Sequence, residues 1–150
     1  MSGQLRLLVA VAAALAGAAV LAGVALADAA YHSERVELRA LAGAPGGGAV
    51  VNIHTDGPRV YAREVYTLRH AAPGNYVVLL NVFPTSTDCS GDGFSVATAL
   101  LETNGAGNGQ ASFTFTPDLV DAFRGLTFGI SWTLIGPAAY ASDCVVVTLD

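Results

Sequence analysis

The segment 126–134 constrains the fold of this chain more than any other stretch. Its apolar side chains stand at every second position, with threonine, glycine or serine between them: Leu126, Phe128, Ile130, Trp132 and Leu134. A period of two sustained over the whole segment predicts a β-strand that buries one face. Because this segment carries the only tryptophan of the chain, we expect the hydrophobic core to form around it.

Much of the remaining chain has the composition of further β-strands. Runs of apolar and β-branched residues, bounded by turn-forming residues, predict strands at 36–41, 49–54, 60–68, 76–83, 94–103, 110–116 and 144–147. The glycine-rich stretches 43–48 and 104–109 predict hairpin connections. Since strands do not alternate with long helices, the sequence predicts an all-β fold, an antiparallel β-sandwich of about seven or eight strands and of immunoglobulin-like or jelly-roll type.

Two of these segments carry finer predictions. Segment 76–83 is almost continuously apolar, which predicts a central strand covered on both faces, or covered on one of them by the loops of a neighbour. Segment 94–103 has a helical alternative at 96–102. The hairpin-type connection that follows it favours the strand.

Another predicted strand breaks its own alternation. Val60 and Ala62 share one face, but the charged pair Arg63-Glu64 shifts the phase and leaves Val65 out of step. An extra residue in one strand of a pair has this effect. We therefore expect a β-bulge at this position.

One short helix is predicted near 117–123. Thr116 suits the N-cap, Pro117 the first helical position and Asp118 the first turn, and Gly125 follows the end. We expect this helix to cover one end of the sandwich with its apolar side chains: Leu119, Val120 and Phe123.

The first 27 residues have the pattern of a secretory signal peptide. Arg6 supplies a positive charge, 7–26 is an unbroken run of apolar and glycine residues, and a small-x-small cleavage signal precedes Asp28. The apolar run is nearly long enough to span a bilayer, so an uncleaved N-terminal anchor is the alternative. Both interpretations predict a single folded domain, 28–150, that is secreted or held in the cell envelope, outside the cytoplasm.

The charge balance narrows the choice of partners. Without the leader, six arginines stand against twelve acids, a net charge of −6. The arginines are spread from Arg35 to Arg124 rather than clustered. A negative net charge without a cluster of arginines disfavours binding to nucleic acid, whose phosphates need a positive surface. It also disfavours docking on anionic membranes, so we expect no membrane contact apart from the leader.

The two cysteines, Cys89 and Cys144, are predicted to form a disulfide. In an exported chain two cysteines usually pair with each other, and closing so long a loop contributes about 4 kcal/mol in the chain-entropy model. A reactive thiol is the alternative. It is disfavoured because there is no Cys-x-x-Cys motif and no neighbouring basic residue to lower a thiol pKa.

The loop around Cys89 contains the first half of a calcium-binding pattern. Asp88, Ser90 and Asp92 place oxygen-bearing side chains at alternate positions, as calcium loops do. The position where such a loop has a bidentate glutamate is Ala99. The disulfide would bring Asp143 close, which makes these four side chains the candidate metal ligands. The alternative is a polar turn around the disulfide.

Other chemistries have weaker support. His32, His54 and His70 could hold copper or zinc only if the fold gathers them, and their wide spacing favours scattered surface histidines. The sequence has no nucleophile elbow, zinc-protease motif or phosphate-binding loop. Any acid pair would have to be assembled by tertiary structure from distant residues: Glu64, Glu102 and Asp118.

These observations predict an exported, non-catalytic β-sandwich, a surface-binding, adhesion or envelope-associated module with an unknown extracellular ligand or protein partner. Two alternatives remain open. One is a metal-dependent or carbohydrate-active enzyme with its site near the Cys89–Cys144 disulfide, and the other is a structural subunit that self-associates into a homo-oligomer.

Overall fold

The computed structural model describes residues 30–56 and 62–149, and this part of the chain is nearly all antiparallel β-structure. Its nine strands are β1 (Ala30–Ala40), β2 (Gly47–Asp56), β3 (Ala62–Arg69), β4 (Gly74–Phe83), β5 (Phe94–Thr103), β6 (Gly109–Phe115), β7 (Leu126–Ile135), β8 (Ala139–Ser142) and β9 (Val145–Leu149). One short helix, α2 (Pro117–Val120), continues into a 3-10 turn, η1 (Asp121–Phe123). The predicted antiparallel all-β fold with one short helix is confirmed.

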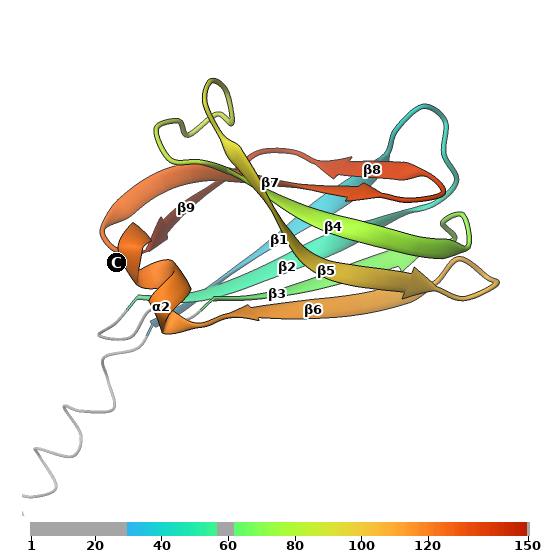
Figure 1. The fold of residues 1–150 in the computed structure, drawn as a ribbon, viewed down its shortest axis with the longest axis horizontal. Coiled ribbons are helices and arrows are strands. Elements are labelled where there is room, and N and C mark those ends of the chain that lie inside the picture. The colour runs from blue at the N-terminus through green and yellow to red at the C-terminus, as the bar shows by residue number, and fades with distance from the viewer. Residues whose placement is uncertain (1–29, 57–61, 150) are drawn as a thin grey trace, which may run out of the picture. The chain divides into compact units, whose positions relative to one another are not determined.

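The strands form one curved sheet that is nearly barrel-shaped. Its order is β5-β4-β7-β8-β1-β2-β3-β6, and β9 also pairs with β7. The two end strands, β5 and β6, are consecutive in the chain and lie side by side at their connecting hairpin (Figure 1). Toward α2 the same two strands diverge. The curved sheet is therefore almost closed at the hairpin end and open at the α2 end.

Strand β7 has the central place that its alternation predicted. It pairs with β4 along one edge and with β8 and β9 along the other. Phe128, Ile130, Trp132 and Leu134 are buried, whereas Leu126 at the start of the strand is exposed. Trp132 is fully buried in the core. The expectation that the core forms around the tryptophan is thus confirmed.

The β-bulge predicted at Arg63-Glu64 is wrong. Strand β3 pairs with both β2 and β6 in an uninterrupted register. Its inward face carries Ala62, Glu64, Tyr66 and Leu68, all buried. The apparent phase shift arises because a glutamate occupies a core position, which carboxylates almost never do unless they are paired.

Three further strands, β5, β4 and β8, can be compared with the sequence predictions. Strand β5 covers the whole of 94–103, so the helical alternative at 96–102 is wrong. Strand β4 is central, between β5 and β7, but its outer face is not fully covered, because Val77 is 42% exposed. Strand β8 was not predicted. It is a short return strand that pairs with the end of β7.

The short helix lies at the open end of the curved sheet, as predicted (Figure 1). Thr116 precedes it in an extended conformation, although the Thr116 side chain makes no capping hydrogen bond. Gly125, at φ +73°, reverses the chain into β7, and its N–H donates to the carbonyl of Leu149 in β9. A left-handed φ favours glycine at this reversal.

The leader, its cleavage site before Asp28 and the predicted strand residue Val60 lie outside the described residues. In the part of the chain that is described, no helix has the length and apolar character needed to cross a membrane.

Candidate functional site

A cavity of about 230 Å³ lies at the α2 end of the curved sheet. Its wall is almost entirely apolar and includes five phenylalanines, Phe94, Phe113, Phe115, Phe123 and Phe128. Aliphatic side chains complete it: Ala62, Leu80, Val82, Val96, Leu119, Val120, Ile130, Val147 and Leu149. A dry apolar cavity of roughly 150 Å³ is enough to bind benzene. This cavity can therefore hold a somewhat larger molecule.

The cavity exists because β5 and β6 separate toward α2. Phe94 and Val96 come from β5, Phe113 and Phe115 come from β6, and α2 closes part of the gap with Leu119. Several of these rim side chains are exposed to solvent, including Phe94, Val96 and Leu119. Exposed apolar side chains that gather at one place often mark an interaction site.

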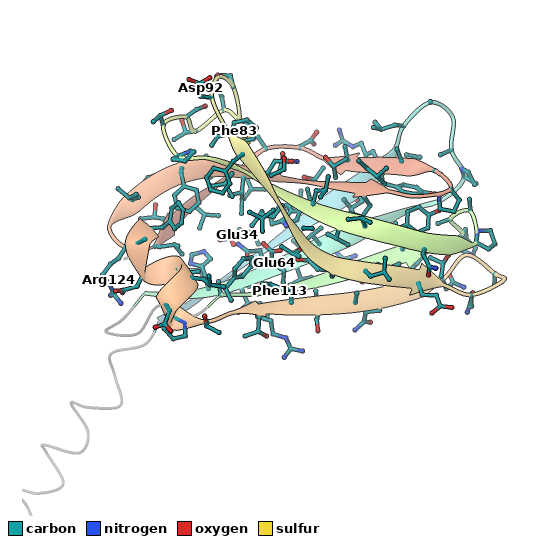
Figure 2. All side chains as sticks on the ribbon, viewed as in Figure 1. Glu34, Glu64, Phe83, Asp92, Phe113 and Arg124 are labelled. Carbon is teal, nitrogen blue, oxygen red and sulfur yellow. A yellow bond between two sulfur atoms is a disulfide. The ribbon has the colours of Figure 1, made fainter. Side chains whose placement is uncertain are left out.

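The inner wall of the cavity carries three polar side chains. Asn52 and His54 come from β2 and Glu64 from β3, and all three are buried. Asn52 lies directly opposite Glu64 in the β2–β3 register. Figure 2 shows Glu64 and Glu34 in the interior of the curved sheet, toward the α2 end. A buried polar wall next to apolar space is the usual composition of a small-molecule site.

Glu34 of β1 lies behind this wall. The Nδ2 of Asn52 donates to Glu34 Oε2 at 3.4 Å, and Nε2 of His54 is 3.3 Å from Glu34 Oε1. The His54 ring also stacks on the ring of His32, with centroids 5.2 Å apart. Three adjacent strands therefore direct polar side chains inward at the same level of the sheet.

Glu64 is held by its neighbour on β3. The hydroxyl of Tyr66 donates to Glu64 Oε2, and the same hydroxyl is hydrogen-bonded to Thr98 Oγ1 of β5 at 2.7 Å. Burial raises the pKa of Glu64 to about 7. The hydrogen bond from Tyr66 and the nearby indole of Trp132 lower this pKa, but their effect is smaller than that of burial. Burial, together with the adjacent Glu64, also raises the pKa of Tyr66. At neutral pH Glu64 is therefore divided between its two protonation states.

Two buried nitrogen atoms near this wall have no hydrogen-bond partner among the described residues, His54 Nδ1 and Trp132 Nε1. The Trp132 N–H acts on the Glu64 carboxyl closely enough to lower its pKa, but the two groups do not meet the geometry of a hydrogen bond. Buried polar atoms are nearly always paired, so an unpaired nitrogen on a cavity-lining side chain makes His54 a candidate for contact with a ligand.

Comparisons of the chain with protein-family models, with curated proteins and with solved structures give no match. The interpretation of the cavity therefore depends on its own geometry and chemistry.

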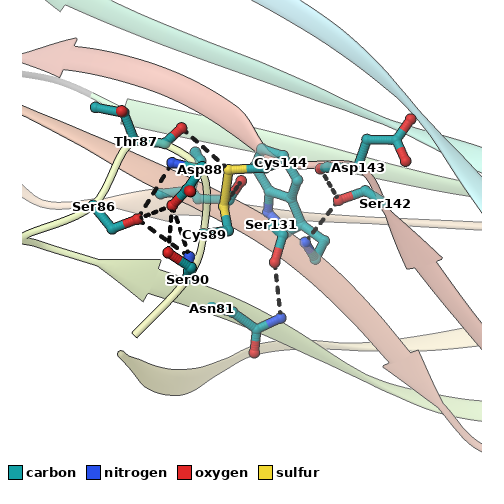
Figure 3. Close-up of a disulfide and its surroundings, with 12 residues drawn as sticks. Asn81, Ser86, Thr87, Asp88, Cys89, Ser90, Ser131, Ser142, Asp143 and Cys144 are labelled. Atoms are coloured by element: carbon teal, nitrogen blue, oxygen red, sulfur yellow. Dashed lines mark hydrogen bonds between the residues drawn. A yellow bond between two sulfur atoms is a disulfide. The ribbon is translucent and has the colours of Figure 1, made fainter. Parts of the chain in front are cut away.

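The predicted disulfide between Cys89 and Cys144 is confirmed, with the two Cα atoms 5.7 Å apart. It joins the loop 84–93 to the short segment between β8 and β9 (Figure 3). The bridge lies over Gly129 of β7, where an added Cβ would be 3.0 Å from Cys89 Sγ. Since Phe128 and Ile130 face the cavity, the disulfide is on the opposite face of β7.

The four candidate calcium ligands have other partners or stand apart. Asp88 accepts hydrogen bonds from the hydroxyls of Ser86 (2.5 Å) and Ser90 (2.6 Å), which lower the pKa of Asp88. Asp143 pairs with Arg39 of β1 at 2.8 Å. Its carboxylate points away from the Asp88 loop (Figure 3).

Asp92, the remaining candidate, lies at the exposed tip of that loop (Figure 2). Within the described ranges, no group of three or more His, Cys, Asp or Glu side chains is arranged to hold a metal. Calcium binding there stays a prediction. A melting temperature that rises with millimolar calcium, and an Asp92→Ala variant that loses the rise, would confirm it.

The polar wall was not predicted from the sequence. The wide spacing of the histidines predicted surface positions, which is wrong for His54, since that side chain is buried. His70 lies elsewhere, in the turn after β3, where its backbone N–H donates to Asn108. Two features of the sequence indicate the polar wall. Glu64 interrupts the apolar alternation of its strand, and Asn52 and His54 lie on the same strand face as the buried Val50.

Proposed function

We propose that the protein is an exported, non-catalytic binding protein that holds a small, largely apolar molecule in the cavity at the α2 end. The observation that carries the proposal is the apolar cavity of about 230 Å³ that adjoins the hydrophobic core. Protein interiors are normally close-packed, and unfilled apolar volume lowers stability. A cavity kept despite this penalty, with an exposed apolar rim, supports ligand binding.

Export is supported by two independent features. The disulfide is consistent with an oxidising compartment, where such bonds persist. The first 27 residues have the pattern of a signal peptide. We infer that the protein is secreted or held in the cell envelope and that its ligand is met there. Intact mass of the exported protein tests this, and a chain beginning at or near Asp28 is expected.

Ligand binding is tested by calorimetry with ethylbenzene as a neutral one-ring probe. A matched pair of variants shows where the probe binds. Val96→Trp places a bulky ring in the cavity wall. Val77→Trp is the control, because Val77 has a similar exposed fraction (42%, against 40% for Val96) but does not line the cavity. We expect wild type and Val77→Trp to bind the probe and Val96→Trp to lose binding. Failure of the wild type to bind would overturn the proposal.

A proton-transfer enzyme is the second candidate, and the raised pKa of Glu64, about 7, favours it. A carboxylate whose pKa lies near the working pH suits a general base beside an apolar site. Phenylacetone in deuterium oxide separates the two functions. Catalysed exchange of its acidic C–H protons, lost in Glu64→Gln, would identify an enzyme, whereas binding without exchange supports the binding protein.

A further inference from the structure

We propose that the molecule held in the cavity is a small organic amine, with its ammonium group at the polar wall of Asn52, His54 and Glu64 and its apolar part among the phenylalanines. This inference depends on the proposed function, because it specifies the chemical class of the ligand in the same cavity.

The first argument is charge. Two acids contact the polar wall from either side of β2, Glu34 on β1 and Glu64 on β3, and the chain contains no lysine. No arginine among the described residues lines the cavity, and Arg63, next to Glu64, points outward and is exposed. A buried carboxylate is stable only when neutralised or paired. With no lysine or arginine among the described lining residues, Glu64 is neutralised either by its own proton or by a positive group on the ligand, and a carboxylate ligand is disfavoured by repulsion.

The second argument is hydrogen-bonding capacity. Tyr66 occupies Glu64 Oε2, and Glu34 lies against His54 Nε2, which leaves His54 Nδ1 without a partner among the described residues. If Nε2–H donates to Glu34, Nδ1 is an acceptor. Glu64 and His54 then carry acceptor atoms on buried side chains that belong to the cavity lining. An ammonium group carries three donors and can satisfy both Glu64 and His54.

The third argument is the aromatic wall. Five phenylalanines line the cavity, and Phe123 and Phe128 lie with ring centroids 5.4 Å apart. Aromatic faces attract organic cations and pack well against a ligand ring. The cavity, about 230 Å³, exceeds the roughly 150 Å³ that accommodates benzene. A one-ring amine with a short chain, such as 2-phenylethylamine, matches both the size and the polarity.

Amine binding should also depend on pH. The titratable groups near Glu64 are Tyr66 on its own strand and His54 on β2. Behind His54, on β1, lie Glu34 and His32. The other neighbours, Thr98 of β5 and Trp132 of β7, are uncharged. An ammonium group stabilises the ionised form of Glu64. When Glu64 is protonated in the free protein, amine binding therefore releases the proton of its carboxyl group. Amine affinity should rise as the pH increases through 7, while ethylbenzene affinity stays constant.

The decisive experiment is calorimetry at neutral pH with three probes that share one ring: 2-phenylethylamine, ethylbenzene and 3-phenylpropanoate. Hydrogen bonds to charged groups are stronger than neutral ones, and ethylbenzene can form none, so we expect the amine to bind at least about ten-fold more tightly than ethylbenzene. The carboxylate should bind most weakly. Glu64→Gln should reduce amine affinity to that of ethylbenzene and leave ethylbenzene affinity unchanged. Glu37→Gln, an outward acid on β1, is the matched control.

The outcomes separate the two proposals. Ethylbenzene or 3-phenylpropanoate binding as tightly as the amine would overturn the amine inference and leave the binding function standing. No binding of any probe would overturn the binding function, and the amine inference with it. Should Glu64→Gln not fold, the ranking of the three probes on the wild-type protein and its pH dependence still decide the question.

Discussion

Tyr66 donates its hydroxyl hydrogen bond to Glu64, two residues earlier on the same inward face of β3. Side chains two apart on a strand point the same way, so the strand itself places the donor beside the acid. Through Thr98 the same hydroxyl also connects β3 to β5, which are not neighbours in the sheet. This pair lies beside the other buried polar side chains of the cavity wall, Asn52 and His54, and the expected pH dependence of stability follows from it.

The stability of the protein should fall as the pH rises from about 4.5 to 7. Burial raises the pKa of Glu64 from 4.5 to about 7 in the folded state, so between these values the folded protein keeps a proton that the unfolded chain has lost. Unfolding is then favoured by increasing pH, and the full shift corresponds to about 3 kcal/mol. Urea denaturation at several pH values measures this. Glu64→Gln should flatten the profile and stabilise the protein at pH 8, whereas the exposed Glu102→Gln should not.

Removing the Tyr66 hydroxyl should destabilise the protein. Tyr66→Phe leaves Glu64 without the hydrogen bond that lowers its pKa, so we expect a loss of about 1–3 kcal/mol and a still higher pKa for Glu64. The double variant with Glu64→Gln measures the coupling of the two side chains in a thermodynamic cycle. Additive effects in that cycle would show that the hydrogen bond does not contribute.

Breaking the disulfide should weaken the domain strongly. The bond closes a long loop, with 55 positions separating its cysteines, and replacing Cys89 by Ser should cost about 2–5 kcal/mol. The loss of melting temperature measures the effect. A thiol assay on the unfolded, unreduced protein should find no free thiol, and two free thiols would contradict the assignment.

Gly129 should tolerate no side chain. An added Cβ would be 2.9 Å from the carbonyl of Ser86 and 3.2 Å from Cys144 Sγ, so it would push the disulfide loop away from β7. We expect Gly129→Ala to cost about 1–3 kcal/mol, as overpacking usually does. Gly105→Ala is the matched control, because an added Cβ there meets nothing within 4 Å. Equal melting temperatures for the two variants would contradict this account.

The features of this protein that depend on local pattern could be predicted from its sequence. The unbroken alternation in 126–134 was enough to place a half-buried strand around Trp132, because period two has one structural meaning over that length. Pro117 after Thr116 marked the start of the helix, since proline suits the first helical position. The Cys89–Cys144 bond could be predicted because the chain has two cysteines and its first 27 residues have the pattern of a signal peptide.

Only the tertiary structure decided where the cavity lies and which polar residues enter it. The curvature that brings β5 beside β6, and their divergence toward α2, depends on the pairing of every strand between them, which no local pattern encodes. Glu64 breaks the apolar alternation of β3 in a way that also predicts a bulge, because local pattern cannot distinguish an inserted residue from a buried acid. Its partners, Tyr66 with Thr98 of β5 and Trp132 of β7, come together only when the curved sheet forms.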